Sequence, residues 1–505
     1  MASTFFGLTI AYSGLQAANT SLTITGHNVS NINTKGYTKQ QAGTQAADAL
    51  RTHTTYGAIG SGVVVTEISQ IRDSYYDVKY RNNMANYGQY SVKESYMGQI
   101  EDYLDEFTLN GYSQEYKNFF SAVNRLTITP GDTSAKNQLI NNAKSLADYF
   151  NTLTTNLRNV QADANNEIKD AVQQINSYAK NIAALNRQIN QIEANYGNAN
   201  DLRDKRNAMI DELSEIVNLE TSEEDMGNNV SNFSVRINGQ TLVSSYSYNT
   251  LETVARTDKK NYSDAEGLYD VQWNSGQKFD MYSTSLSGHL KGLIDIRDGN
   301  NGEHENIETD DNGNNVTDSD GNLVLTTAPA ADKTVSYKGV PYYQAQLNEF
   351  AKIFSDAVNK IMKSGYTSDG SSKGISLFVT QPNTTVMSAG NITVNPQLLK
   401  NADLLAIKKE QNDGESDAKI MEELNKLQSE KIFAGGTGSY FLESIVSDMS
   451  IDSQKAVNLY KNYTDLKTSI HNQRLSIMGV DTDEEAMDMI KYQQAYNLNS
   501  KMMSV

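Results

Sequence analysis

A long stretch without helix breakers constrains this chain most strongly. Between Gly131 and Gly197 the sequence contains neither glycine nor proline. Apolar residues recur there with alternating spacings of four and three, the pattern of a helix that packs along one seam. The first part of the seam consists of Leu139, Ala143, Leu146, Phe150, Leu153, Leu157, Val160, Ala164 and Ala171. The spacing then slips by one residue, and the seam continues with Ile175, Tyr178, Ile182, Leu185, Ile189 and Ile192. Such a slip is a stutter, which unwinds a supercoil locally without ending the helix. At 1.5 Å per residue the stretch predicts a rod roughly 90 Å long, which needs helical neighbours along its length.

Both ends of the chain carry apolar seams with the same spacing. The N-terminal seam consists of Leu8, Ala11, Leu15, Ala18, Leu22, Thr25, Val29 and Ile32. The C-terminal seam consists of Ile445, Met449, Ala456, Leu459, Tyr463, Leu466, Ile470 and Ile477. A single amphipathic helix cannot bury its own apolar stripe. We therefore expect the two ends to pack against each other or against the ends of other copies.

The middle of the chain has the pattern of short strands. Residues 233–237 alternate between apolar and polar side chains, Asn238 and Gly239 follow, and residues 241–243 continue the pattern. This order predicts a β-hairpin with a two-residue turn. The sequence is then rich in Asn, Asp, Gly, Ser and Thr up to about residue 341, which is typical of a small β-rich module with long loops.

Together these patterns predict a fold that is mainly α with a β insertion. We expect an elongated multi-domain molecule, with a long antiparallel helical bundle built from both termini and a small β-rich outer module. The predicted regions are residues 1–40 and 465–505 as a terminal helical assembly region, 41–230 and 342–464 as a helical rod, and 231–341 as the β-rich module, with an insertion loop at 299–337. The expected neighbours of the rod helix are residues 71–107 and 438–479.

Charge and cysteine content exclude several classes of function. A formal net charge of -18 leaves no basic surface for nucleic acid or for an anionic membrane. The chain contains no cysteine, which excludes disulfides, thiolate metal sites and cysteine nucleophiles. No apolar run approaches the ~18 residues that a membrane span needs. The first basic residue is Lys35, so the apolar start lacks the positive region of a secretory signal. We expect neither nucleic-acid nor membrane partners.

Candidate metal and nucleotide sites are weak. Gly57, Gly60 and Gly62 precede an apolar run instead of following a strand, so they indicate a turn and not a dinucleotide site. The acidic loop with Asp310, Asp311, Asp318 and Asp320 lacks the full spacing of a calcium loop. Turn chemistry is the favoured interpretation of these aspartates, and calcium binding is the alternative.

No catalytic group is apparent either. The five histidines have no metal-ligand spacing, and no nucleophile elbow occurs. Carboxylate pairs such as Asp211-Glu212 lie in charged helical sequence, and none of them stands out as catalytic. Thr482 and Glu485 have the spacing of a capping box that opens the last helix. We predict a protein that is not an enzyme and that uses no cofactor or metal.

The segment from Asn28 to Tyr37 has the sequence Asn-Val-Ser-Asn-Ile-Asn-Thr-Lys-Gly-Tyr. Small polar residues end a helix here, Gly36 permits unusual backbone dihedrals, and Tyr37 offers an amphipathic anchor. The segment closely resembles the motif that follows the first helix in axial proteins of the bacterial flagellum, which are the rod, hook and hook-associated proteins.

Further segments resemble the hook-associated members of that family, in order along nearly the whole chain. They are residues 60–66, 71–73, 80–81, 201–206, 211–213, 287–298, 343–347, 479–485 and 490–496. The sequence after the helical pattern at 343–361 is short, which implies that the large outer domains of some members are reduced or absent here. Residues 299–337 resemble a local insertion.

The resemblance implies a structural protein that forms the first hook–filament junction layer, outside the cell, after type III export without a cleaved signal peptide. Its terminal helices would line the inner tube, would be largely disordered before assembly, and would polymerise with neighbouring copies in a helical ring. The implied partners are the flagellar hook protein, the second hook-associated junction protein and a cytoplasmic export chaperone that binds the C-terminal region.

The expected assembly residues come from both ends of the chain. They are Leu8, Leu15, Leu22, Asn28, Asn31, Thr34, Gly36, Tyr37, Leu459, Leu466, Ile470, Gln493, Gln494 and Tyr496. The alternatives within the same class are the second junction protein and a hook or rod subunit. A flagellum-associated hydrolase and a coiled-coil receptor are alternatives of other classes, but the sequence offers neither a catalytic constellation nor a membrane span.

Overall fold

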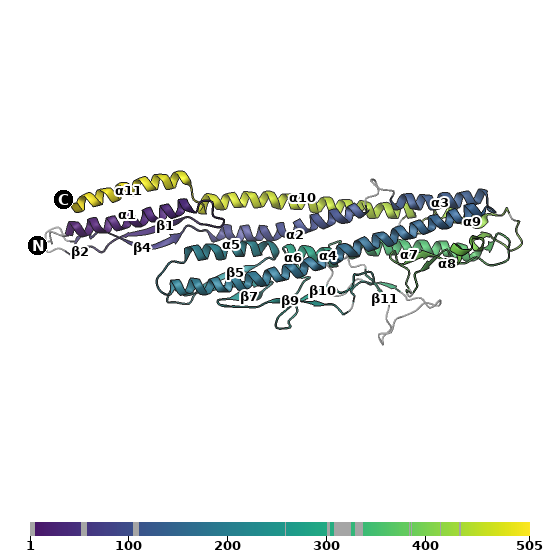
Figure 1. Cartoon of the computed structure of the whole chain (residues 1–505), viewed down its shortest axis with the longest axis horizontal. Coiled ribbons are helices and arrows are strands. Elements are labelled where there is room, and N and C mark those ends of the chain that lie inside the picture. The colour runs from purple at the N-terminus through teal and green to yellow at the C-terminus, as the bar shows by residue number, and fades with distance from the viewer. Residues whose placement is uncertain are drawn as a thin grey trace.

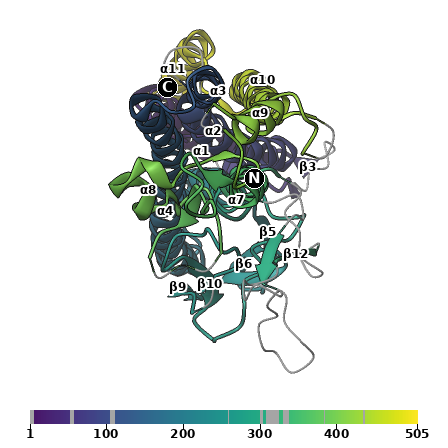
Figure 2. The ribbon, with the colours of Figure 1, turned by 90° about the vertical axis from the view of Figure 1, so that its right-hand side faces the viewer.

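The chain forms an elongated bundle with both of its ends at the same end of the molecule (Figure 1). The computed structural model describes residues 6–51, 58–104, 111–257, 259–299, 304–307, 325–328, 337–382, 384, 386–414, 416–433 and 436–504. Its helices run along the long axis, and the larger sheet lies along one side of them, as the end view shows (Figure 2).

The helices confirm the prediction of a mainly α-helical fold. They are α1 (Phe6–Ser30), α2 (Ser74–Leu104), α3 (Tyr112–Ile128), α4 (Thr133–Glu193), α5 (Asn200–Ile216), α6 (His289–Asp298), α7 (Val340–Ser364), α8 (Pro396–Lys400), α9 (Lys419–Lys426), α10 (Gly438–Met478) and α11 (Thr482–Ser504). A short 3₁₀ turn, η1, spans Ala402–Leu404. The long helix predicted between Gly131 and Gly197 is α4, and it begins where the Asp132 carboxylate accepts a hydrogen bond of 2.9 Å from the Ser134 N–H.

The neighbours of α4 differ in part from the prediction. Helices α2, α3, α5, α6 and α7 pack against α4, whereas α10 packs along α2. Tyrosine rings hold α10 there, since Tyr460 lies 5.5 Å from Tyr87 and Tyr463 lies 5.3 Å from Tyr90, between ring centroids. The prediction that residues 438–479 pack directly on α4 was therefore wrong, because these residues pack on α2 instead.

All the described sheets are small and antiparallel. The largest has the order β5 (Glu220–Asp225), β6 (Ser231–Ile237), β7 (Gln240–Ser244) and β8 (Ser247–Tyr248). The paired strands elsewhere are β1 (Gln40–Ala46) with β4 (Val63–Gln70), β2 (Leu50–Arg51) with β3 (Ala58–Ile59), β9 (Leu251–Ala255) with β10 (Tyr269–Trp273), β11 (His304–Ile307) with β12 (Leu325–Ala328), β13 (Tyr366–Thr367) with β16 (Ala406–Lys408), and β14 (Phe378–Thr380) with β15 (Ile392–Val394).

The predicted hairpin is β6–β7. Its two turn residues, Asn238 and Gly239, have φ of 50° and 76°, as a primed turn requires. The sheet begins at Glu220, upstream of the predicted module boundary, and α10 runs without a break across residue 465. The domain boundaries themselves stay a prediction. The four aspartates of the possible calcium loop lie outside the described residues.

One continuous hydrophobic core holds the rod together. It extends from Val92 to Ala456 and includes Phe350, whose ring stacks on Phe150 at 5.3 Å and on Phe433 at 5.1 Å. Within the described part of the chain, this core contains no residue of α1 or α11. The terminal helices are therefore attached to the rod by contacts of another kind.

Candidate assembly interface

The terminal unit, which we define as α1, β1, β4 and α11, joins the rod where four distant segments meet. We call this place the joint, and its segments are residues 28–40, 71–81, 200–215 and 467–485. Helix α1 packs against α11 and against both strands, and α10 ends beside α2 (Figure 1). Six of the segments that resemble the flagellar family, residues 28–37, 71–73, 80–81, 201–206, 211–213 and 479–485, thus meet at the joint, whereas residues 287–298 and 343–347 lie in the rod on α6 and α7.

Asn28 organises the turn between α1 and β1. It is 1% exposed, and its amide nitrogen donates to the Gln40 carbonyl at 2.9 Å and to the Glu485 carboxylate at 3.1 Å. Its side-chain oxygen accepts from the Gln40 N–H at 3.0 Å and from the Tyr37 hydroxyl at 2.7 Å. Because a buried amide must be satisfied, these four bonds fix the N-terminal motif against the start of α11.

The start of α11 corrects the capping-box prediction. The Asp481 carboxylate caps this helix by accepting from the N–H groups of residues 483 and 484, at 2.9 and 3.2 Å. Thr482 is the first helical residue, and Glu485 turns away to the joint. There its carboxylate lies 3.1 Å from the Lys39 ammonium, which is itself only 11% exposed. The prediction was wrong because a nearly buried cation is a stronger partner for Glu485 than a helix-end N–H group.

A series of ion pairs with alternating charges crosses the joint beside the contact between Glu485 and Lys39. Its links are Arg72 to Asp77 at 2.6 Å and to Asp204 at 3.3 Å, Arg474 to Asp77 at 2.8 Å and to Asp211 at 2.6 Å, and Arg81 to Asp211 at 2.8 Å. Each of these side chains is at most 16% exposed. These ion pairs hold α2, α5 and α10 together at a place that the hydrophobic core does not reach.

Asp204 also connects this series of ion pairs to the N-terminal motif. Its carboxylate accepts from the N–H and the hydroxyl of Thr38, at 3.0 and 2.8 Å. Burial raises the pKa of Asp204 above its usual value, although the Thr38 bonds and Arg72 act to lower that pKa. The residues that follow Tyr37 are thereby bonded directly to α5.

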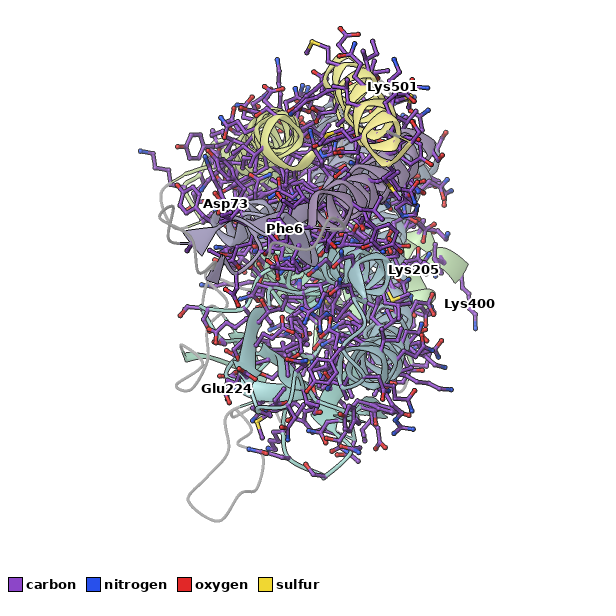
Figure 3. All side chains as sticks on the ribbon, turned by 90° about the vertical axis from the view of Figure 1, so that its left-hand side faces the viewer. Phe6, Asp73, Lys205, Glu224, Lys400 and Lys501 are labelled. Atoms are coloured by element: carbon purple, nitrogen blue, oxygen red, sulfur yellow. The ribbon has the colours of Figure 1, made fainter. Side chains whose placement is uncertain are left out.

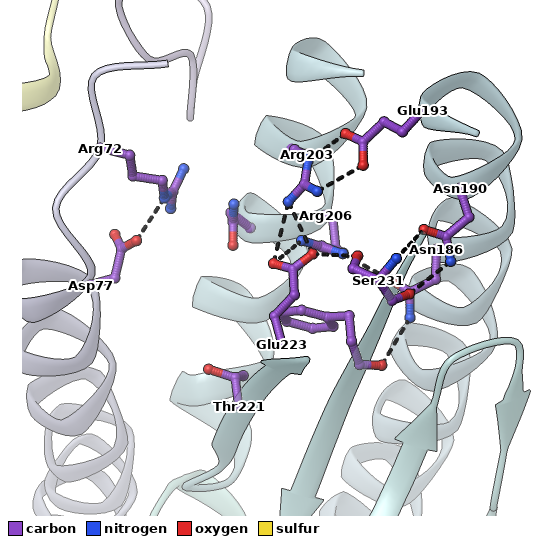
Figure 4. Close-up of polar contacts among 12 residues, drawn as sticks. Arg72, Asp77, Asn186, Asn190, Glu193, Arg203, Arg206, Thr221, Glu223 and Ser231 are labelled. Carbon is purple, nitrogen blue, oxygen red and sulfur yellow. Dashed lines mark hydrogen bonds and ion pairs between the residues drawn. The ribbon is translucent and has the colours of Figure 1, made fainter. Parts of the chain in front are cut away.

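A second ionic cluster fastens α5 to the end of α4 and to β5 (Figure 4). Arg203 forms a bidentate pair with Glu193 at 2.7 and 2.8 Å and reaches Glu223 at 3.0 Å. Arg206, which is 2% exposed, pairs with Glu223 at 3.2 Å and lies 3.8 Å from the centre of the Phe233 ring. These contacts explain why the segment at 201–206 carries two arginines three residues apart.

The Glu223 carboxylate makes this cluster sensitive to acid. Partial burial acts to raise the pKa of Glu223, but Arg206, the Ser231 hydroxyl and Arg203 outweigh it, so that pKa lies below its usual value near 4.5. A carboxyl whose pKa is lowered by folding stabilises the fold above its unfolded-state pKa, and that contribution is lost as pH falls.

We therefore expect the resistance of the α4–α5–β5 region to unfolding by urea to fall as the pH drops below the usual carboxyl pKa of 4.5 and through the lowered pKa of Glu223. Glu223→Gln should already be less stable at about pH 6 and should show a smaller drop over the same interval. The matched control is Glu224→Gln, on the same strand, whose side chain points into solvent (Figure 3). Equal pH dependence in wild type and Glu223→Gln would refute this assignment.

Helix α11 is packed lightly on the rest of the chain. Among its described residues only Glu485 is fully buried. The helix approaches α1 closely near Gly14, where a Cβ atom would lie 2.8 Å from the Asn499 side chain. Large apolar side chains remain on its other face, with Met487, Ile490 and Leu498 between 58% and 65% exposed. An apolar face of this kind is typical of a surface that a partner covers.

The predicted assembly residues fall into two groups. Asn28 and Tyr37 lie inside the joint with Asn31, Thr34 and Gly36 around them, and Gly36 has φ of +81° and packs close to Ala208. The seam residues spread over several faces. Leu8, Leu466, Gln493 and Gln494 are exposed, Leu15, Leu22, Leu459 and Tyr496 are half-buried, and Ile470 is buried. Since a straight helix drifts about 20° per heptad, a seven-residue seam cannot stay on one face of a long straight helix.

Sequence reasoning did not single out Lys39, Asp77 or Arg474 as site residues. Their charges look like those of any solvated helix, and only their partners from distant segments distinguish them. Metal sites and membrane spans were both sought within the described ranges. No group of three or more potential metal ligands is placed to hold a metal ion, and no helix is long and apolar enough to cross a membrane.

An elongated bundle with paired terminal helices, an ionic joint and an exposed apolar helix face is typical of a structural protein that assembles. Comparison with known proteins agrees with this class. The family described as the flagellar hook-associated protein FlgK helical domain matches residues 97–378, more than half of the chain. The family described as flagellar basal body rod FlgEFG protein C-terminal matches residues 471–505.

Full-length relatives give the same result. The chain is 27% identical over 529 residues to flagellar hook-associated protein 1 of Bacillus subtilis, covering 100% of this chain and 97% of the relative. It is 27% identical over 541 residues to flagellar hook-associated protein 1 of Salmonella typhimurium, covering 98% and 96%. Its fold is similar to the flagellar hook junction protein FlgK from Burkholderia pseudomallei, with a TM-score of 0.62 and 15% identity over 79% of this chain and 100% of that chain. The chain therefore belongs to the FlgK family of flagellar hook-associated proteins, and it is a structural, non-enzymatic component of the flagellum.

Proposed function

We propose that this chain forms the first layer of the hook–filament junction and that its copies polymerise through their terminal helices. The observation that carries the proposal is the exposed apolar face of α11, which belongs to a terminal unit that contributes nothing to the rod core among the described residues. A layer of such subunits covers these faces by contacts between neighbours. The name of the relatives, hook-associated protein 1, supports the position at the hook.

The partners we propose are those of such a layer. They are further copies of this chain in a helical ring, the flagellar hook protein on one side, the second hook-associated junction protein on the other, and a cytoplasmic export chaperone before assembly. The chain would lie outside the cell after type III export. The exposed side chain of Leu466, on the C-terminal half of α10, offers a contact for the chaperone without disturbing the packing of Ile470.

This proposal is tested by removing the chain from the cell and by locating it on the flagellum. Cells that lack the chain should bear hooks without filaments and release filament subunits into the medium, and expression of the chain should restore filaments. Immunogold labelling should place it in a single band at the boundary between hook and filament. Labelling along the whole hook, or normal filaments without the chain, would contradict the proposal.

A further inference from the structure

The joint encloses a cavity of about 570 Å³ that the contacts described above leave open. Its apolar lining comes from all sides of the joint and includes Ile32, Met84, Leu475, Met478 and Val480. Ile32 and Leu475 are 39% and 50% exposed, so the lining reaches the surface. Cavities of this size accept several side chains of a bound partner.

The charges around the cavity are mostly paired. Lys35 lies 2.7 Å from Glu212, and Arg474 lies 2.6 Å from Asp211. Glu215 also lines the cavity, and no ion pair to it is found within the described part of the chain. Lys467 and His471 also line the cavity, and the Lys467 ammonium lies 3.8 Å from the centre of the Tyr87 ring. The cavity thus combines apolar side chains with charged ones, and Glu215 is the carboxylate at its α5 side that has no ion pair in the described part of the chain.

The terminal unit presents a surface of matching chemistry. At 100° per residue, Met487, Ile490, Gln494, Leu498 and Met502 lie within one arc of α11, which we call the outer stripe. Glu485 and Asn499, which face the joint and α1, lie toward the opposite side of the helix. Leu498 and Met502 are 63% and 60% exposed. Lys501 lies within the same arc at this end of the stripe and projects from α11 away from the rod (Figure 3).

We propose that the joint cavity of one copy receives the C-terminal end of the outer stripe from a second copy. Leu498 and Met502 enter the apolar lining, and Lys501 pairs with Glu215. This inference rests on the proposed function and names the contact through which neighbouring copies join.

Charge favours a second copy as the occupant. Copies with a net charge of -18 repel one another, so they associate best where the surfaces are apolar or locally opposite in charge. The C-terminal half of α11, from Gln494 onward, contains no acidic residue, and its one charged side chain is Lys501. That half is therefore suited to a cavity with a carboxylate at its edge.

The geometry suits a helical layer. The cavity lies at the base of the terminal unit and the stripe ends at its tip, so the two surfaces differ and the contact is heterologous. A neighbour displaced along the long axis by the length of α11, roughly 35 Å, brings its stripe end to the cavity. Heterologous contacts of this kind repeat along a helix without closing on themselves.

Disulfide cross-linking in isolated flagella tests the contact, because the chain has no cysteine of its own. The variant Leu475→Cys/Met502→Cys is expressed as the only copy of the chain, and intact flagella are oxidised and separated on a denaturing gel. We expect a ladder of multimers of this chain that each single variant lacks. Neither position belongs to the rod core, so the variant should fold.

The matched control is Ile128→Cys/Met502→Cys. Ile128 is an apolar residue with 75% exposure at the far end of α3, and it should give no ladder. Attached filaments without a cross-link between positions 475 and 502 would overturn the docking contact and leave the proposed function intact. A cross-link within one copy, or to a different protein such as a chaperone, would also overturn it. Absence of the chain from the junction would overturn the proposed function itself.

A charge reversal gives a second measurement. Lys501→Glu and Glu215→Lys should each reduce the fraction of hooks that carry a filament, and the double variant should restore more of that fraction than either single variant. An additive loss in the double variant would count against the pairing.

Discussion

Removing α11 should abolish filament attachment while leaving the rod folded. In the variant that lacks residues 482–505, the outer stripe is lost and Asn28 and Lys39 lose their partner Glu485. The hydrophobic core ends at Ala456, so its packing does not depend on α11. A deletion from residue 465 is less informative, because it also removes the buried side chain of Ile470.

Two measurements separate assembly from folding in this variant. The fraction of hooks with attached filaments, counted by electron microscopy, should fall close to zero. The thermal unfolding of the purified chain should keep its main transition, since a helix with one buried residue contributes little to it. A deletion of residues 308–324, which lie between the terminal seams, is the control and should leave filaments attached. Normal filaments on cells with the α11 deletion would refute the role of this helix.

Replacing Arg474 by alanine should loosen the joint strongly. This guanidinium lies between the carboxylates of Asp77 and Asp211, at 2.8 and 2.6 Å, and is 14% exposed. Without it, the two largely buried carboxylates lose a shared cation, although Asp77 keeps Arg72 and Asp211 keeps Arg81. The expected cost is therefore about 1.5–3 kcal/mol, the range for a lost hydrogen bond to a charged group, and not the larger cost of an unpaired buried charge. Arg474→Lys should recover only part of the loss, because an ammonium cannot reproduce the guanidinium fork.

Amide hydrogen exchange measures this effect locally, which matters because a chain of several parts need not unfold in one step. Protection in the last turns of α10 and the first turns of α2 should fall by roughly one to two orders of magnitude. Protection in α4 should stay unchanged. The control is Arg125→Ala, an arginine whose hydrogen bond to Gln138 lies at the surface. Unchanged protection at the joint in Arg474→Ala would show that the alternating charges do not hold it.

Most of the secondary structure could be predicted because it depends on local periodicity. The missing glycine and proline between residues 131 and 197 predicted α4, and the Asn238-Gly239 turn predicted the β6–β7 hairpin. The capping box failed for a tertiary reason. Glu485 has the correct spacing for it, but Lys39, more than four hundred residues away in the sequence, binds its carboxylate instead.

The candidate site could be predicted only as a set of fragments. The sequence singled out the motif from Asn28 to Tyr37 and the segment at 201–206, but not that Thr38 and Asp204 bond to each other. Likewise, the terminal seams indicated that the ends pack together, and α1 does pack against α11. The predicted C-terminal seam itself lies on α10, however, and that helix packs along α2. Which seam residues remain exposed depends on the neighbours that each helix face meets.

The sequence by itself determined the elongated helical design, the absence of cysteine chemistry and the resemblance of the N-terminal motif to the flagellar family. The tertiary structure decided how the terminal unit is held to the rod. The physical reason is the range of the interactions. Helical periodicity and turn chemistry are encoded within a few residues, whereas a buried ion pair such as Arg474 with Asp211 exists only after segments far apart in the sequence have met.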